Sequence, residues 1–448
     1  VRRIPHPPPR PRSLGTIKQQ ELAQNQRKAM LKELKLKNIK SFEEATLPIG
    51  GFTVLLGTNA SGKSNVRDVL RFLHGLSRGY KLVEIFAGKY EGGDLIWRGI
   101  RGGPNLFVRD GVSSGTVGLL SGGPRKLQFE ITLREVRGKP TRVYDETLRA
   151  DGASLYSTRN EDNQRTNMGP KFLRVYLKRG GDYKRNHTED CLSDEAVLTQ
   201  VPEFYLKRND DGIRVVREGV DNLSQALMQM RFLDLSPDTM REPAFVGQQV
   251  LGDRGENLSS VLQQLVESQS KERDILEWLK VLTPMDVAAL EFEKDSRGRV
   301  SLVLLEHDKR RTPAESASDG TLRFLAYLAL AFSTETPTTC FVEEIDNGIH
   351  PARLQLLVEL IESQSKARGL QVIASSHSPA MMNLLSEDTL LNAVLVYRTE
   401  ESKSSKVKLL RDLPNFELLS KKRQPGVLME TGWFESTVES LEFVEDDK

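Results

Sequence analysis

The stretch Gly57-Thr-Asn-Ala-Ser-Gly-Lys-Ser-Asn65 decides the fold of this chain. It matches the phosphate-loop pattern G-x-x-x-x-G-K-S at every fixed position. An apolar run, Phe52–Leu56, comes directly before it, and apolar residues recur at helical spacing from Val66 to Leu73. A buried strand, a glycine loop and a helix form the context that this motif needs, so the sequence predicts an α/β nucleotide-binding fold.

Each part of this loop has a chemical role towards ATP. The glycines let backbone N–H groups turn towards phosphate oxygens, and the start of the helix adds favourable dipole charge. Lys63 is expected to reach the β- and γ-phosphates, and the hydroxyl of Ser64 to bind Mg²⁺. The residues predicted to bind the nucleotide are Gly57, Asn59, Ala60, Ser61, Gly62, Lys63, Ser64 and Asn65.

Two carboxylates and a histidine follow later apolar runs. Residues 338–342 lead into Glu343 and Glu344, and residues 371–374 lead towards His377. We expect Glu343 to hold Mg²⁺, Glu344 to orient and activate the attacking water, and His377 to sense the γ-phosphate. A solvated acidic turn and a structural histidine are the alternatives. The predicted catalytic set is Glu344, Glu343, His377 and Lys63.

A second anion site is predicted where another helix begins. Ser318 and Gly320 open the apolar helix expected over 319–332. Ser318 suits the N-cap position of this helix, and a helix N-terminus also attracts phosphate. Because one γ-phosphate cannot easily meet two separate helix N-termini of one chain, two copies facing head to tail would share each site.

The composition of the 448 residues excludes several classes of protein. Hydrophobic residues make up 38% and charged residues 28%, as in a chain that buries a core. No apolar run approaches the roughly 20 residues that span a bilayer, and the basic N-terminus lacks the apolar segment of a secretory signal. Two cysteines cannot form a disulfide framework, so a cytoplasmic setting without membrane contact is expected.

Changes in composition divide the chain into segments. Residues 1–40 contain eleven Lys or Arg against two Glu, although the net charge is only +2. Residues 434–448 are acidic and are expected to be frayed. The expected segments are a disordered basic tail (1–30), an N-terminal lobe with the P-loop (31–150), an inserted lid or effector region (151–285), a C-terminal lobe (286–400) and an extension with an acidic tail (401–448).

Contact with DNA is a further hypothesis. Residues 159–187 contain eight Lys or Arg and three acidic residues, with Phe172, Tyr176 and Tyr183 between them. This mixture suits binding of phosphate with base stacking. A solvated charged face is the alternative.

The order of the motifs resembles the heads of ATP-binding-cassette (ABC) ATPases. Residues 317–321, ASDGT, stand where that superfamily has its signature loop, and 341–351, FVEEIDNGIHP, look like its Walker B strand and D-loop. His377 looks like the switch histidine. The resemblance implies a mixed sheet flanked by helices, and a dimer that sandwiches two ATP molecules. Ser318 and Gly320 would then contact the nucleotide of the partner.

Within this superfamily, several stretches point to particular groups. Residues 34–65 are similar to the start of the SMC and RecF-like heads. Residues 318–331, 343–351 and 375–379 look most like prokaryotic ABC-like ATPases of the AAA class, which include the ATPase half of the OLD nucleases and phage-defence ATPases. The resemblance covers most of residues 31–400.

The chain also departs from the superfamily. Glu343 stands where an aspartate is usual, and residues 95–99 are the candidate for a Q-loop that lacks its glutamine. No long coiled coil divides the head. No nuclease domain follows it, so any nuclease is expected to be a separate polypeptide.

These observations favour an ABC-type AAA ATPase that hydrolyses ATP in a head-to-tail dimer or higher homo-oligomer. It would act as sensor or motor of a DNA-linked anti-phage system with a separate effector, a nuclease or toxin. One alternative is a RecF-like DNA-repair ATPase. Another is a nucleotide-dependent scaffold that does not hydrolyse ATP, although the intact Glu343–Glu344 pair argues against it. The missing Q-loop and the large middle segment argue against a transporter subunit.

Overall fold

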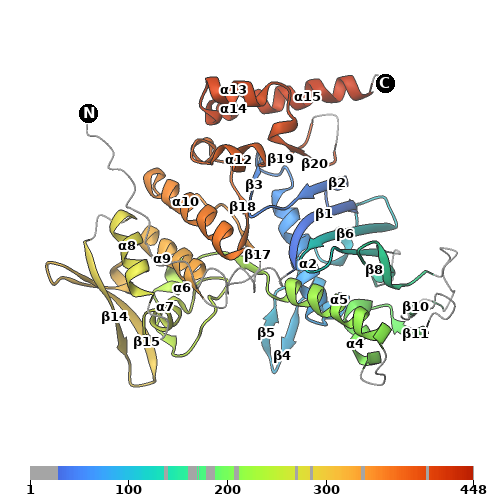
Figure 1. Ribbon diagram of the computed structural model, residues 1–448, viewed down its shortest axis with the longest axis horizontal. Coiled ribbons are helices and arrows are strands. Elements are labelled where there is room, and N and C mark those ends of the chain that lie inside the picture. The colour runs from blue at the N-terminus through green and yellow to red at the C-terminus, as the bar shows by residue number, and fades with distance from the viewer. Residues whose placement is uncertain are drawn as a thin grey trace.

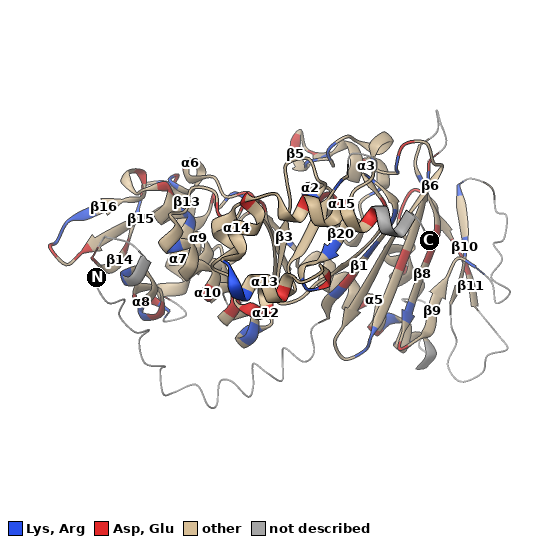
Figure 2. Ribbon diagram, turned by 90° about the horizontal axis from the view of Figure 1, so that it is seen from above, with Lys and Arg blue, Asp and Glu red and all other residues tan. Residues whose placement is uncertain are grey.

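The computed structural model describes residues 29–446 except 136–139, 160–168, 170, 178–186, 206–210, 268–270, 283–285, 334–338 and 400–402. A central, mostly parallel sheet lies between two lobes, one built on a large antiparallel sheet and the other on a smaller sheet with helices (Figure 1). Figure 2 shows the same two lobes from above, on opposite sides of β3. The P-loop fold predicted from the sequence is confirmed.

The central sheet has six strands in the order β12-β17-β18-β3-β19-β20. Its pairs are parallel except for β19 with β20. Every residue of β3, β17 and β18 is buried, as expected for apolar runs in a sheet covered on both faces. The bounds are β3 Phe52–Leu56, β12 Arg231–Leu233, β17 Thr339–Val342, β18 Gln371–Ser375, β19 Val394–Tyr397 and β20 Lys406–Leu409.

This sheet separates two hydrophobic cores. Leu55 of β3 packs in one core, whereas Val54 and Leu56 pack in the other, because successive side chains of a strand point to opposite faces. The P-loop helix α2 (Lys63–Ser77) contributes to the first core, and α9 (Asp319–Phe332) and α10 (Pro351–Arg368) contribute to the second. The helix that begins beside Ser318 therefore lies across the sheet from the P-loop helix.

The N-terminal lobe is built on an eight-stranded antiparallel sheet in the order β11-β10-β9-β8-β7-β6-β1-β2. Alternate residues of β7 are buried, as the apolar alternation predicts. The strands are β1 Met30–Ile39, β2 Phe42–Pro48, β6 Ser114–Gly122, β7 Leu127–Arg134, β8 Arg142–Ala150, β9 Ala153–Ser157, β10 Phe172–Leu177 and β11 His187–Leu192. Other elements of this lobe are α3 Leu82–Ala87, β4 Lys89–Glu91, β5 Asp94–Trp97, a 3₁₀ turn at Pro104–Leu106, α4 Val197–Tyr205 and α5 Asp211–Met228.

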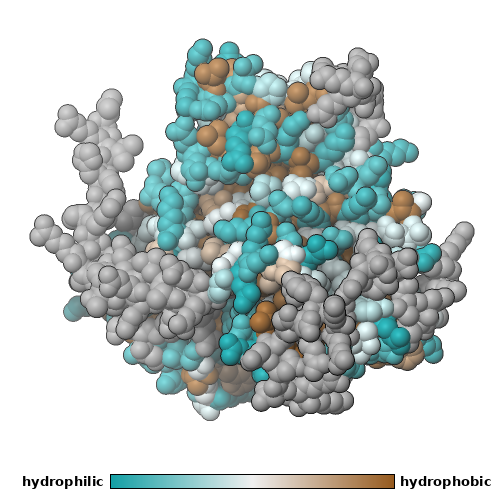
Figure 3. Space-filling model, turned by 45° about the vertical axis from the view of Figure 1, so that its right-hand side comes forward, coloured by the Kyte–Doolittle hydropathy of each residue, from teal (hydrophilic) through white to brown (hydrophobic). Residues whose placement is uncertain are grey.

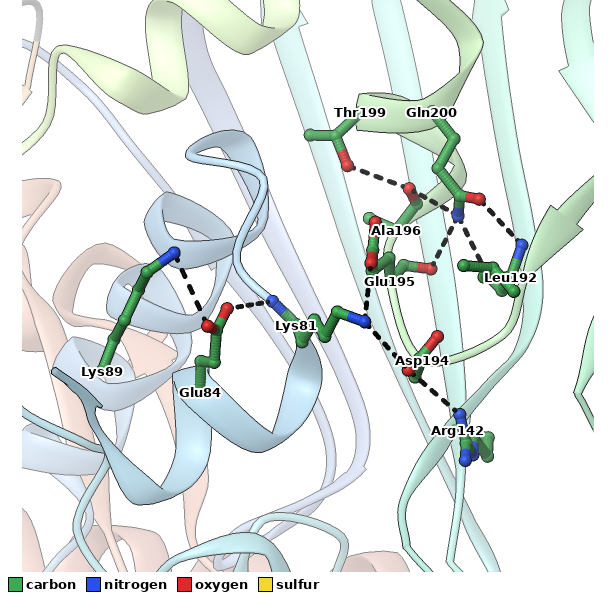
Figure 4. A network of polar contacts seen from close by, with 10 residues as sticks. All are labelled: Lys81, Glu84, Lys89, Arg142, Leu192, Asp194, Glu195, Ala196, Thr199 and Gln200. Atoms are coloured by element: carbon green, nitrogen blue, oxygen red, sulfur yellow. Dashed lines mark hydrogen bonds and ion pairs between the residues drawn. The ribbon is translucent and has the colours of Figure 1, made fainter. Parts of the chain in front are cut away.

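A network of polar contacts ties α3 to this sheet (Figure 4). The ammonium of Lys81 lies 3.7 Å from a carboxylate oxygen of Asp194 and 3.4 Å from one of Glu195. The backbone N–H of Lys81 donates to the carboxylate of Glu84 at 2.9 Å. Arg142 of β8 pairs with Asp194 at 3.5 Å. The segment that leads into the β4–β5 hairpin is thereby anchored beside β8 and α4.

The other lobe carries a four-stranded sheet with helices. Its elements are α6 Pro237–Met240, β13 Ala244–Phe245, α7 Leu258–Glu267, α8 Glu272–Leu282, β14 Val287–Lys294, β15 Arg299–Glu306, β16 Arg311–Pro313 and a 3₁₀ turn at Ala314–Ser316. The helix predicted over 319–332 is confirmed as α9, with both ends as expected.

The expected inserted region, 151–285, contributes to three separate sheets. Strands β9, β10 and β11 extend the N-terminal sheet, β12 is an edge of the central sheet, and β13 pairs with β15. Helices α7 and α8 pack in the hydrophobic core that contains α9, whereas α5 packs in the hydrophobic core that contains α2. These residues therefore belong to both lobes, because their apolar faces are buried by elements distant in sequence.

The prediction of a frayed tail at 434–448 is wrong for its described part. After α11 Pro379–Met382, α12 Glu387–Leu391, a 3₁₀ turn at Leu410–Asp412, α13 Phe416–Lys422 and α14 Pro425–Glu430, the chain forms α15 Trp433–Asp446. Phe434 and Val438, one turn apart, are each only 2% exposed. The ring of Phe434 lies 5.9 Å from that of Phe416, so packing stabilises the helix despite its charge. Figure 3 shows hydrophobic surface between hydrophilic side chains at the top of the molecule, where α13–α15 lie.

Two predictions fall largely outside the described residues. The basic tail lies there as far as residue 28, and so does most of 159–187, including Tyr183. Over the described parts of both lobes, Figure 2 shows Lys and Arg interspersed with Asp and Glu. Among the described helices, none has the length and apolarity that crossing a membrane requires.

Candidate nucleotide-binding site

The P-loop connects β3 to α2 through a backbone that only glycine suits at two points. Gly57 and Gly62 have φ values of 143° and 121°. A Cβ atom on Gly57 would lie 2.1 Å from the carbonyl oxygen of Val396, and one on Gly62 would lie 2.5 Å from Oγ of Ser405. Glycine is thus required at both positions for two reasons: the backbone has a positive φ, and another segment of the same chain lies too close for a side chain.

The start of α2 is open to an anion. Its N-cap residue is Gly62, and no side chain caps the helix. Helix N-termini have backbone N–H groups without helical partners, which suit phosphate oxygens. Lys63 folds back over the loop, where its ammonium donates to the carbonyls of Gly57 at 2.6 Å and Thr58 at 2.8 Å. Burial lowers the pKa of Lys63, and the nearby Glu344 carboxylate opposes that shift.

A cavity of about 690 Å³ lies in front of this loop. Most of the predicted site residues line it: Asn59, Ala60, Ser61, Gly62, Lys63, Ser64, Asn65, Glu343, Glu344 and His377. They come together because β3, β17 and β18 are neighbouring parallel strands whose carboxyl ends share one edge. Gly57 shapes the loop without lining the cavity.

The two adjacent glutamates have different surroundings. Glu343 forms an ion pair with Arg67 at 3.0 Å, and Nη2 of Arg101 lies 4.0 Å from its other oxygen. Glu344 has a φ of 47°, a left-handed conformation that is unusual for a residue other than glycine. Its N–H donates to Oγ of Ser375 at 3.0 Å, so β18 helps to hold the turn.

The residues after β18 complete this edge. The N–H of Ser376 donates to the carbonyl of Leu55 at 3.0 Å, which fixes the chain beside β3. His377 follows and lines the cavity. Asn347, from the turn after β17, also lines it, and its amide donates to Glu344 at 3.4 Å. A histidine, an amide and a carboxylate therefore surround the space in front of the P-loop.

The donors in this cavity fit a magnesium ion bound together with a nucleotide. Ser64 and Glu343 line the same cavity and supply a hydroxyl and a carboxylate oxygen. Mg²⁺ prefers oxygen ligands and commonly keeps water and phosphate oxygens beside one or two protein ligands. Within the described residues, no group of three or more His, Cys, Asp or Glu could hold a metal alone.

Ser318 and Gly320 are absent from the lining of this cavity. Oγ of Ser318 accepts from the N–H of Thr321 at 3.2 Å and so caps α9. A Cβ atom on Gly320 would lie 3.4 Å from the carbonyl oxygen of Gly348 and 3.3 Å from Nη1 of Arg353. The structure does not bring this helix start to the P-loop of its own chain.

Several lining residues were missed by the sequence analysis: Arg101, Asp234, Arg323, Tyr327 and Arg398. Asp234 directly follows β12 and Arg398 directly follows β19, so the rule that located Glu343 could have found both. No pattern in the neighbouring sequence indicated Arg101, Arg323 or Tyr327. None of residues 95–99, the Q-loop candidate, lines the cavity, and the indole N–H of Trp97 donates to the carbonyl of Ile85 at 3.1 Å.

Comparison with known proteins finds similarity to an AAA-domain family and to an ATP/GTP phosphatase. Residues 222–383 match the family model described as "AAA domain, putative AbiEii toxin, Type IV TA system". Over 370 residues the chain is 22% identical to an ATP/GTP phosphatase of Helicobacter pylori, covering 80% of this chain and 88% of that protein. A stretch of 53 residues is 45% identical to the chromosome partition protein Smc of Methanocaldococcus jannaschii, which is 12% of this chain and 4% of that protein.

Solved structures with some likeness include Smc heads. One is the SmcHead bound to the C-winged helix domain of ScpA, with a TM-score of 0.46, 15% identity, and 85% of this chain and 97% of that chain covered. Another is a Smc head with an extended coiled coil bound to the C-terminal domain of ScpA from Pyrococcus furiosus, with a TM-score of 0.42, 15% identity and coverage of 88% and 100%. Residues 222–383 are thus similar to an AAA domain, and the P-loop and the strand-end carboxylates fit the binding of a nucleotide in this cavity.

Proposed function

We propose that this protein binds and hydrolyses ATP with Mg²⁺ in a head-to-tail homodimer, and that it is the sensor or motor subunit of a DNA-linked anti-phage system. A separate nuclease or toxin would be its effector. The observation that supports the ATPase activity best is the single cavity that holds the P-loop, Glu343, Glu344 and His377. Phosphoryl transfer depends mainly on such positioning and electrostatics.

The residues of the cavity would have different roles towards phosphate, metal and water. The ammonium of Lys63, which now donates to loop carbonyls, would turn to the β- and γ-phosphates. Ser64 and Glu343 would hold Mg²⁺, which neutralises phosphate charge. Glu344 would orient the attacking water and accept its proton, and His377 would donate a hydrogen bond to the γ-phosphate. The strained backbone at Glu344 supports a positional role for this carboxylate.

The dimer is supported by the place of Ser318. Ser318 and Gly320 begin α9, a helix of 14 residues, but do not line the cavity of their own chain. A second molecule turned head to tail could present this helix start to the nucleotide. Each ATP would then be bound between two chains, and closure of the dimer would depend on it.

The biological role rests on the comparisons. The matched family's description mentions a putative AbiEii toxin of a type IV toxin–antitoxin system, which favours a defence role with an effector. The 53-residue similarity to a chromosome partition protein favours the second candidate, a RecF-like ATPase of DNA repair. DNA is a partner in both proposals.

The test compares wild type with Glu344→Gln, and uses Glu430→Gln, an exposed glutamate of α14, as the matched control. ATP turnover and molar mass by light scattering are measured with and without double-stranded DNA. We expect Glu344→Gln to lower turnover at least a hundredfold, which is about 2.7 kcal/mol, and to accumulate an ATP-dependent dimer.

Each result tests one part of the proposal. Stimulation of the wild type by phage-like linear DNA favours a DNA sensor. Normal turnover in Glu344→Gln contradicts its proposed role. A wild type that binds ATP without turnover, even with DNA, supports the scaffold alternative.

A further inference from the structure

Arg101 lies beside Ser64 and Glu343, the two residues proposed to hold the metal. It follows the β4–β5 hairpin, and its side chain lines the nucleotide cavity. Nη2 donates to the backbone carbonyl of Ser64 at 2.8 Å and lies 4.0 Å from Oε1 of Glu343. One guanidinium group thus bridges the two residues that fit Mg²⁺.

A second guanidinium shares the carboxylate of Glu343. Arg67 of α2 lies 3.0 Å from Oε2, while Arg101 approaches Oε1. Since two positive groups already surround this carboxylate, a divalent cation brought to the same oxygens would be repelled. Arg67 is the less accessible of the two, with 15% of its side chain exposed against 54% for Arg101. Arg101 is therefore the group that can leave.

A buried ion pair anchors Arg101 on its other side. Nε of Arg101 lies 3.3 Å from Oδ1 of Asp68, whose other oxygen pairs with Lys40 at 3.2 Å. The side chains of Asp68 and Lys40 are only 2% and 6% exposed. Lys40 also donates to the backbone carbonyl of Arg101 at 2.5 Å. Asp68 can keep Arg101 paired after it moves away from Glu343, so the charge of Arg101 stays compensated.

The chain after Arg101 suits such a movement. Gly102 and Gly103 have φ values of 82° and 62°. No atom lies within 4 Å of a Cβ built on Gly103. The space beside Gly103 is therefore open, whereas a Cβ on Gly102 would lie 2.9 Å from Cβ of Leu106.

We propose that Arg101 is an internal counter-ion of the metal site. It neutralises Glu343 in the nucleotide-free head and moves away from this carboxylate when Mg²⁺ binds with ATP. The movement of Arg101 then shifts the β4–β5 hairpin, so that the position of the hairpin depends on bound metal and nucleotide. This inference rests on the proposed function.

The test measures how much Mg²⁺ strengthens nucleotide binding. The dissociation constant of a fluorescent, non-hydrolysable ATP analogue is measured in EDTA and in excess Mg²⁺. The constant in EDTA divided by the constant in Mg²⁺ is then compared between variants. Affinity of the free analogue for Mg²⁺ cancels in this comparison. Arg101→Gln is the main variant, and Arg98→Gln, an exposed arginine three positions earlier, is the matched control.

We expect Arg101→Gln to raise the ratio at least tenfold, because metal no longer competes with a guanidinium and metal-free nucleotide loses a cation. Arg98→Gln should leave the ratio within twofold. Arg101→Lys keeps the charge without the bridging geometry and should give an intermediate ratio, which serves if Arg101→Gln fails to fold. An unchanged or lower ratio in the Arg101 variants overturns the proposal.

The proposed function and this inference fail in different ways. If wild type binds the analogue in neither condition, the proposed function is wrong and the inference falls with it. If wild type binds, and binds more tightly with Mg²⁺, the ratio in Arg101→Gln alone decides the inference.

Discussion

The hydroxyl of Ser405 donates a hydrogen bond to the carbonyl of Ser61 at 2.5 Å, although 344 positions separate the two residues. Oγ of Ser405 also lies 2.7 Å from Oγ of Ser41, which in turn accepts from the amide of Asn65 at 2.7 Å. Ser405 is completely buried. The P-loop is therefore held in shape by the chain just before β20, far outside its own motif.

This contact predicts the effect of Gly62→Ala. The added Cβ would lie 2.5 Å from Oγ and 3.0 Å from Cβ of Ser405. We expect the dissociation constant for ATP to rise at least tenfold, about 1.4 kcal/mol, because the loop must shift. The measurement is titration with a fluorescent ATP analogue.

The control for this prediction is Gly79→Ala. Gly79 also has a positive φ, 72°, but nothing lies within 4 Å of its Cβ position. It should keep normal affinity. The double variant Gly62→Ala with Ser405→Gly should recover part of the loss if the clash is its cause. Equal affinity in Gly62→Ala and wild type would contradict this account of the loop.

The stability of the chain should depend strongly on Gln371. This side chain is fully buried, and it joins β18 to β1 through bonds with the N–H and the C=O of Leu31, both at 2.8 Å. It also donates to the carbonyl of Gly50 at 3.1 Å. Gln371→Ala would leave these groups buried without partners. We expect the free energy of unfolding to fall by about 2–4 kcal/mol in chemical denaturation.

Gln355→Ala, on the exposed side of α10, is the matched control. It should change the free energy of unfolding by less than about 0.5 kcal/mol. A loss of similar size in both variants would show that the buried hydrogen bonds of Gln371 do not stabilise the fold.

The buried carboxyl of Glu146 should make the free energy of unfolding depend on pH. Burial raises the pKa of its carboxyl to about 7, while hydrogen bonds from Tyr156 and from the N–H groups of Leu198 and Val197 oppose the shift. Between the ordinary pKa near 4.5 and this value, the folded protein holds a proton that the unfolded chain has released. The stabilisation is therefore complete below about pH 4.5 and is lost as the pH rises through about 7.

The measurement is the free energy of unfolding from pH 5 to pH 8. In wild type the Glu146 contribution should fall by as much as about 3 kcal/mol over this range. Glu146→Gln should be less stable at pH 5, because its NH₂ group cannot accept a hydrogen bond from a backbone N–H as a carboxyl oxygen does, and it should show a flatter profile. Exposed Glu439→Gln should follow wild type. Parallel profiles in wild type and Glu146→Gln would exclude Glu146 as the titrating group.

The local part of the fold could be predicted from the sequence. The P-loop needs a particular order of glycine, lysine and serine within a few positions, and α9 has its cap, Ser318, next to its apolar face. The strand ends before Glu343 and His377 were recognisable because each apolar run is short and ends in polar residues. The same rule applies to Asp234 and Arg398, but β12 has only three residues and gives a weak signal.

Residues close together in the chain are therefore enough to predict the loop, its helix, the buried strands and the residues after them. Only the folded chain shows that Arg101 bridges Ser64 and Glu343 and that Ser405 supports the P-loop. The physical reason is that strand pairing and core packing join segments by their buried faces, whatever their distance along the chain. Periodicity shows which face is buried, and only the folded chain shows which partner covers it.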